Sequence, residues 1–131
     1  MERMSGRLFI SELVALEVLT TLRTAFRDAS KADWNDVVAE FWADYAANFN
    51  VVEIGPDVVD RAMDLAVDYR TARARSMDLL HLATALHLKG PRAPQQVTIV
   101  TSDHDLTNLA KLNGLRTFDP SREPLAALPR W

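Results

Sequence analysis

Cysteine is absent from this chain of 131 residues. Its absence excludes disulfide bonds, zinc sites built on thiolates and cysteine nucleophiles. Long apolar runs are also missing, and none approaches the ~20 residues that a membrane-spanning helix needs. The N-terminus, MERMSGRLFI, contains no apolar stretch long enough for a secretory signal peptide. We therefore expect a cytoplasmic protein with no membrane partner.

An excess of positive charge is missing as well. The chain has 15 Lys and Arg against 18 Asp and Glu, a formal net charge of -3. Binding to a polyanion would therefore need a local basic patch or a metal ion. Hydrophobic residues make up 48% and charged residues 25%, which is typical of a soluble globular protein. The length suits one domain with a proper core.

Helical and strand patterns alternate along the chain. Helices are predicted from apolar residues at helical spacing, with Ser11 as an N-cap and Pro56 in a first turn. Strands are predicted where runs are short and β-branched or apolar, and the run 97–100 is expected to be fully buried. The predicted order is strand 7–10, a largely buried helix 12–27, helix 33–47, strand 49–54, helix 56–74, a helix ending at 89, loop 91–96, strand 97–100, helix 106–112 and strand 116–118. This order predicts an α/β domain around a short, mainly parallel sheet flanked by helices.

The segment RSMDLLHLATALHL places a single acidic residue, Asp78, at the start of an otherwise apolar helix. A carboxylate beside so much apolar surface must be satisfied. The free N–H groups and the positive dipole end of a helix N-terminus would satisfy it. A bound divalent cation would do so equally well. Both interpretations stay open at this point.

Two further acidic residues are expected near the carboxyl ends of strands, where the chemistry of parallel sheets collects. Asp103 follows the apolar run 97–100, and Glu17 lies on the helix after the first strand. Three carboxylates at one edge of a sheet would repel one another unless a cation neutralised them. Oxygen ligands favour Mg²⁺ or Mn²⁺ over zinc, and such a site would polarise a phosphodiester.

Each acidic residue also has a purely structural interpretation. Glu17 fits a partly buried glutamate paired with an arginine, and Asp103 fits a turn residue that caps the following helix. The sequence TSDHD offers Ser102, Asp103 and Asp105 as either caps or ligands. The sequence alone does not choose between them.

Three other residues are candidates for substrate contact. Arg73 and Arg75 belong to a basic run just before Asp78. Such a run is usually a solvated helix end, but beside an acidic site it could hold phosphates. His104 is expected near the mouth of the site.

The motifs SELVALEVLTTLR, SMDLLHLATALHL and VTIVTSDHDLTNLAKLNGLRTFDP together resemble the successive motifs of PIN domains, especially those of VapC-type toxins. The resemblance covers residues 8–120. It implies a single PIN-like, Rossmann-like three-layer domain over residues 1–131, with 119–131 as an irregular tail. By motif position, Glu17, Asp78 and Asp103 correspond to the second, third and fourth acidic residues of the family, and Asp105 to an accessory one.

The function that the resemblance implies is a ribonuclease that uses Mg²⁺ or Mn²⁺ to cleave RNA, as the toxin of a toxin–antitoxin system. Such proteins usually form homodimers and are inhibited by a VapB-like antitoxin. Catalytic roles would then fall to Glu17, Asp78 and Asp103, metal binding to these three and Asp105, and substrate binding to Arg73, Arg75, Ser102 and His104.

One departure from the family pattern affects the activity. Family members begin with a strand that ends in an aspartate, in a pattern like L-D-T/S-x-x-L. Only sixteen residues precede Glu17 here, and none is an aspartate, so this chain lacks the first ligand and its strand. Three explanations for the missing strand stay open: the sequence starts late, a partner chain supplies the strand, or the protein is a decayed paralogue. The alternative to a ribonuclease is therefore a non-catalytic module that pairs with an antitoxin or an intact toxin.

Overall fold

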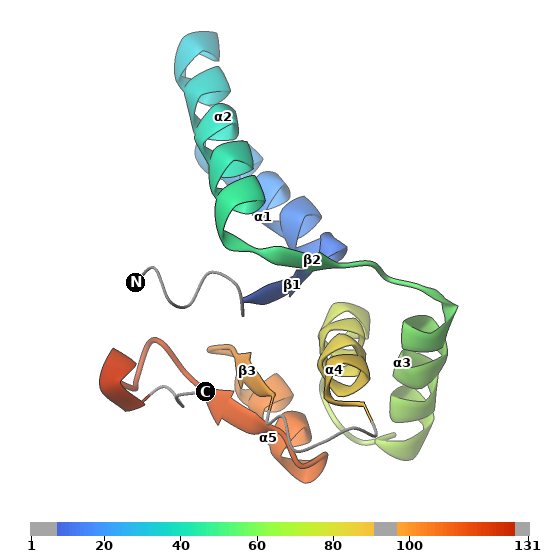
Figure 1. Cartoon of the computed structure of the whole chain (residues 1–131). Coiled ribbons are helices and arrows are strands. Elements are labelled where there is room, and N and C mark those ends of the chain that lie inside the picture. Colours follow the sequence, from blue (N-terminus) through green and yellow to red (C-terminus); the bar gives the residue numbers. More distant parts are fainter. Residues whose placement is uncertain (1–7, 91–96, 128–131) are drawn as a thin grey trace. The chain divides into compact units, whose positions relative to one another are not determined.

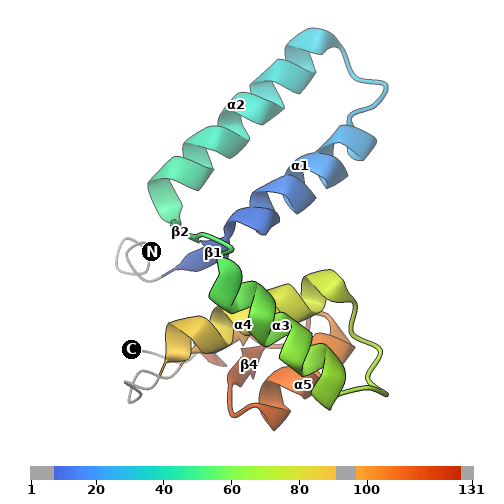
Figure 2. The same ribbon diagram turned by 90° about the vertical axis from the view of Figure 1, so that its right-hand side faces the viewer.

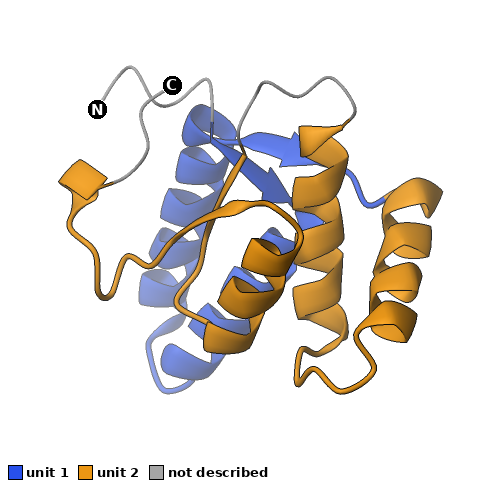
Figure 3. Ribbon diagram, turned by 90° about the horizontal axis from the view of Figure 1, so that it is seen from below, with its two compact units in different colours: residues 1–54 blue, residues 55–131 orange. Residues whose placement is uncertain are grey.

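The computed structural model describes residues 8–90 and 97–127. These residues form a mixed α/β structure with five α-helices and short parallel strands (Figure 1). The predicted fold class is thereby confirmed. The chain divides into two compact units, residues 1–54 and residues 55–131 (Figure 3), and each is described by itself below.

The first unit is a helical hairpin attached to a pair of parallel strands. Its elements are β1 (Phe9–Ser11), α1 (Glu12–Ala25), α2 (Lys31–Asn48) and β2 (Asn50–Val52). The two helices lead away from the strands and back to them (Figure 2). Ser30 is the N-cap of α2, and its Oγ accepts a hydrogen bond from the Asp33 N–H at 3.1 Å. The Ile54 N–H, after β2, donates to the Glu12 carboxylate at 2.9 Å, which ties the end of the unit to the start of α1.

Little of the apolar surface of the first unit is covered. Among its described residues, the only buried apolar side chain is that of Ala15, whereas Leu16 is 62% exposed and Trp42 is 46% exposed. The prediction that much of the helix 12–27 is buried is therefore wrong. The apolar residues of this helix lie on more than one side of it, and only the side that carries Ala15 is covered.

The second unit contains three helices and two parallel strands. Its elements are α3 (Pro56–Asp68), α4 (Ser76–Lys89), β3 (Thr98–Val100), α5 (His104–Leu112), β4 (Arg116–Phe118) and a short 3-10 turn, η2 (Leu125–Ala127). Residues Thr98 and Arg116 face each other across the strand pair. The φ angle of Gly90, directly after α4, is +51°, and that of Gly114, after α5, is +76°. Both values suit glycine at the end of a helix.

The core of the second unit lies around α4, which packs against α3, α5 and β3. Leu82, near the middle of α4, is 0% exposed. The other buried apolar residues described in this unit are Val58, Ala62, Leu65, Ala83, Ala85, Leu106, Leu109, Ala110, Leu115 and Phe118. Apolar burial of this kind is the main favourable contribution to folding, and it holds α4 and α5 in the core of the unit.

Two further expectations about this unit need correction. The helix that begins at Pro56 ends at Asp68 instead of 74, because the chain turns there and the Ala72 N–H donates to the Tyr69 carbonyl at 3.0 Å. The strand 97–100 is not fully buried, since β3 pairs only with β4 in its described sheet and Val100 is 54% exposed. The predicted loop 91–96 lies outside the described residues. None of the helices described here is long and apolar enough to cross a membrane.

Candidate functional site

Asp78 lies in the first turn of α4 and is half-buried. Its Oδ2 accepts a hydrogen bond from the Arg75 backbone N–H at 3.0 Å. This contact is the carboxylate half of a capping box, and an arginine side chain has no acceptor with which to complete the other half. Asp78 therefore caps its helix through one oxygen. Its Oδ1 has no hydrogen-bond partner among the described residues.

Asp103 is the N-cap of α5 and is exposed. Its Oδ1 accepts a hydrogen bond from the Leu106 N–H at 2.7 Å, and its own N–H donates to the Thr101 hydroxyl at 3.1 Å. The backbone carbonyl of Asp103 accepts from the Thr107 hydroxyl at 2.8 Å. The capping interpretation is thus correct for Asp103, as it is for Asp78. As with Asp78, one carboxylate oxygen has no hydrogen-bond partner in the described part of the chain.

The other predicted residues of the TSDHD segment lie beside Asp103 on the connection from β3 to α5. Asp105 is half-buried in the first turn of α5. His104 is exposed, and its Nε2 lies 3.3 Å from the amide nitrogen of Asn108. The Ser102 hydroxyl donates to Oδ1 of Asp119 at 2.9 Å. Ser102 is therefore engaged in the structure of this loop.

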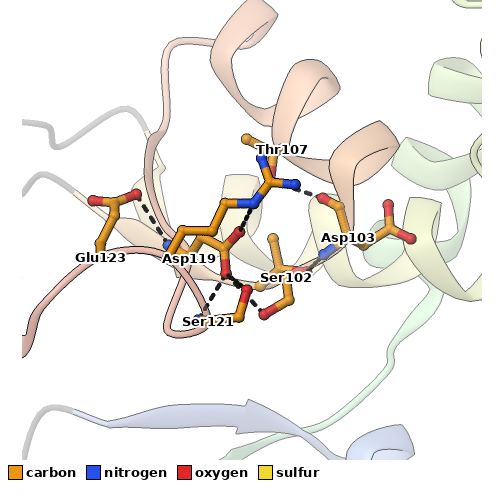
Figure 4. Close-up of polar contacts among 8 residues, drawn as sticks. Ser102, Asp103, Thr107, Asp119, Ser121 and Glu123 are labelled. Atoms are coloured by element: carbon orange, nitrogen blue, oxygen red, sulfur yellow. Dashed lines mark hydrogen bonds and ion pairs between the residues drawn. The ribbon is translucent and has the colours of Figure 1, made fainter.

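Asp119, directly after β4, is the centre of a cluster that sequence reasoning assigned to the irregular tail. Figure 4 shows Ser102, Ser121 and Glu123 around it, with Asp103 nearby. Its Oδ1 accepts from the Ser121 hydroxyl at 2.6 Å and from the Ser121 N–H at 2.9 Å. The Asp119 N–H donates to the Glu123 carboxylate at 3.2 Å. Because Asp119 also holds Ser102, it ties the segment after β4 to the segment that carries Asp103.

The hydrogen bonds of this cluster also shift the protonation equilibrium of the Asp119 carboxyl group. The Ser121 hydroxyl, followed by the Ser121 N–H, holds the pKa of the Asp119 carboxyl below its usual value. Ser102 and Arg122, whose Nε lies 3.7 Å from Oδ2, lower this pKa further. A signal for the cluster was present in the sequence, since Asp-Pro-Ser is suited to an Asx turn in which the carboxylate accepts the N–H two residues on.

Arg73 and Arg75 are exposed on the connection between α3 and α4. Arg75 is the N-cap of α4, so its guanidinium belongs to the same helix end as Asp78. Glu17 is exposed on α1, in the first unit, and its backbone carbonyl accepts from the Thr21 hydroxyl at 3.0 Å. The predicted acidic residues are thus distributed over the two units, with Asp78, Asp103 and Asp105 in the second.

The described residues do not form a complete metal-binding site. No group of three or more His, Asp or Glu side chains that could hold a metal ion is found among residues 8–90 and 97–127. The second unit instead offers two carboxylates, each anchored by a backbone N–H at a helix start. A carboxylate held in this way still has an oxygen for a cation, and oxygen donors suit Mg²⁺ and Mn²⁺.

The chain belongs to the PIN domain family, whose model matches residues 1–112. Members of this family are typically nucleases and generally bind divalent metal ions. The match includes Glu17, Asp78, Asp103 and Asp105. No curated protein compared with the chain matches it.

Proposed function

We propose that this protein is a metal-dependent endoribonuclease and the toxin of a VapBC-type toxin–antitoxin system. The observation that supports this most strongly is the arrangement of Asp78 and Asp103 within a PIN domain. Each is oriented by a backbone N–H at 3.0 Å or less and keeps a second oxygen outside the described hydrogen bonds. A carboxylate that is oriented in this way and has an oxygen to spare is suited to bind a divalent cation.

In this proposal Asp78, Asp103 and Asp105 are ligands for Mg²⁺ or Mn²⁺, together with Glu17 of the first unit. The cation supplies charge neutralisation at the phosphodiester. Arg75 and Arg73, both exposed beside the start of α4, hold phosphate groups of the RNA because a guanidinium matches phosphate oxygens in pairs. His104 is exposed at the start of α5 and contacts the substrate from there. Ser102 orients the loop through its bond to Asp119.

The proposed partners are a second copy of the chain and a VapB-like antitoxin. The feature that supports a protein contact is the aromatic face of α2, formed by Phe41, Trp42 and Tyr45. The ring centroids of Trp42 and Tyr45 are 5.5 Å apart, and Trp42 is 46% exposed. Exposed aromatic side chains of this kind are enriched at protein interfaces.

The test is cleavage of structured RNA during a titration with Mn²⁺, comparing the wild type with Asp78→Asn. Asp64→Asn is the matched control, because Asp64 is an exposed acid on the neighbouring helix α3. Asp78→Asn should lower the rate by about a hundredfold or more, since a bound cation contributes several kcal/mol to transition-state stabilisation. The control should cleave at the wild-type rate.

Two results would contradict the proposal. Cleavage that persists without metal, or that survives in Asp78→Asn, would show that the carboxylates do not hold the catalytic cation. A wild type that binds no Mn²⁺ at millimolar concentration and cleaves nothing would favour the alternative, a non-catalytic module that pairs with an antitoxin or an intact toxin. A measurement of molecular size after the chain is mixed with such a partner would then show whether the two form a complex.

A further inference from the structure

A basic hollow lies where α1 ends and α2 begins, entirely within the first unit. Its volume is about 590 Å³, and it is largely open to solvent. The residues that give it chemical character are three cations and two aromatic residues: Arg23, Arg27, Lys31, Phe26 and Trp34.

The charge of the hollow is opposite to that of the chain. Three cations line it and no acidic residue does, although the chain has a net charge of -3. Within residues 8–90 and 97–127, none of Arg23, Arg27 and Lys31 forms an ion pair. Cations that are not neutralised by the protein attract a polyanion locally.

The aromatic residues restrict what kind of anion fits. Phe26 and Trp34 are both half-buried, whereas Arg27 and Lys31 are exposed, so aromatic surface lies beside solvent-exposed positive charges. A small inorganic anion needs only the charges. A single-stranded nucleic acid uses both parts, because its bases stack on aromatic rings while cations follow its phosphates.

We infer that this hollow is a binding site for single-stranded RNA, with a base stacked on the Trp34 indole and adjacent phosphates held by Arg23, Arg27 and Lys31. The inference rests on the proposed function in that the RNA is the substrate of the same protein. It adds a contact on the unit that carries neither Asp78 nor Asp103. Binding here needs no metal ion and no intact acidic site.

The test measures binding of a short fluorescein-labelled oligouridylate in EDTA, by fluorescence anisotropy at several salt concentrations. Arg27→Glu combined with Lys31→Glu should weaken binding by about tenfold or more. It should also lower the slope of the logarithm of the binding constant against the logarithm of the salt concentration by about 1.4, because each of two lost phosphate contacts to a single strand contributes about 0.7. The control is Arg61→Glu with Lys111→Glu, which changes the charge equally at exposed positions of the second unit and should bind nearly as well as the wild type.

Stacking is measured separately in a variant that keeps Trp34 as its single tryptophan, Trp42→Phe with Trp131→Phe. Oligouridylate should quench its fluorescence. Trp34→Leu should weaken binding on the order of tenfold, and Trp34→Phe should restore most of the affinity. Circular dichroism of each variant checks that the helices remain folded.

Several outcomes would overturn the inference: equal loss of affinity in the control pair, an unchanged salt dependence, or no quenching of Trp34. Displacement of the RNA by polyglutamate as readily as by unlabelled oligouridylate would show a general anion or acidic-protein surface. The outcome of this binding test does not depend on whether the proposed function is correct. Asp78→Asn is expected to bind the oligouridylate normally in EDTA even though it no longer cleaves, so loss of binding and loss of cleavage are distinguishable.

Discussion

The two units differ in where they place their apolar side chains. Among the described residues, all but one of the buried apolar side chains belong to residues 55–131, and Ala15 is the exception. Both units also expose large apolar side chains, such as Leu16 and Trp42 in the first and Val67 and Leu112 in the second, so the difference lies in what is buried. The comparison indicates that apolar burial stabilises mainly the second unit, whereas the described part of the first unit buries almost no apolar side chain.

The largest test of this difference replaces one leucine in each unit. Leu82→Ala, at a site that is 0% exposed, should lower the free energy of unfolding by about 2–5 kcal/mol, through lost burial and the cavity that remains. Leu16→Ala, at a site 62% exposed, should change it by about 0.5 kcal/mol or less. Urea denaturation followed by circular dichroism measures both. Similar losses in the two variants would remove the contrast between the units.

A smaller effect separates the structural role of Asp103 from its proposed chemical one. Asp103→Ala removes the cap on α5 and should cost about 1 kcal/mol of unfolding free energy. Asp103→Asn should leave stability nearly unchanged, because asparagine caps a helix as well as aspartate does. Under the proposed function, both variants should lose Mn²⁺-dependent RNA cleavage. An asparagine variant that is as unstable as the alanine variant would contradict the capping geometry.

The smallest effect concerns the pH dependence of the second unit. Because the pKa of Asp119 is lower in the folded chain than in the unfolded one, its stabilising contribution is complete above about pH 4 and is lost as the pH falls through the folded pKa. Asp119→Asn should therefore be less stable than the wild type at neutral pH and approach it in acid. Urea midpoints at neutral and acidic pH measure this, and a constant difference between the two proteins would contradict it.

Local signals in the sequence were sufficient for the elements that have clear ends. Pro56 begins α3, Gly90 follows α4, and the strand predicted at 116–118 is β4. The end of α3 was not predictable in this way, because no glycine or proline marks the turn after Asp68. The exposure of the side chains of α1 was also not predictable from the local sequence. Periodicity shows which residues share a side of the helix, but it does not show which side another element covers.

In the candidate site, too, local contacts were predictable from the sequence and contacts between distant residues were not. The sequence suggested that Asp78 and Asp103 either cap helices or bind a cation, and the structure shows the caps. The cation remains a prediction. Whether Glu17 joins them depends on contacts between residues far apart in the chain, which spacing within a motif does not encode. The contact of Asp119 with Ser102 was not predictable from spacing, because Ser102 belongs to a different segment of the chain.

Under the proposed function, Asp78 and Asp103 would each have two roles, as an acceptor at a helix start and as a ligand for a cation. A helix start needs an acceptor, so selection on folding alone retains an acceptor side chain at these two positions, whether or not the chain cleaves RNA. An amide meets the same need without the charge. Asparagine at these two positions in a related chain would therefore mark the loss of metal chemistry with the fold intact, whereas aspartate there is compatible with either history.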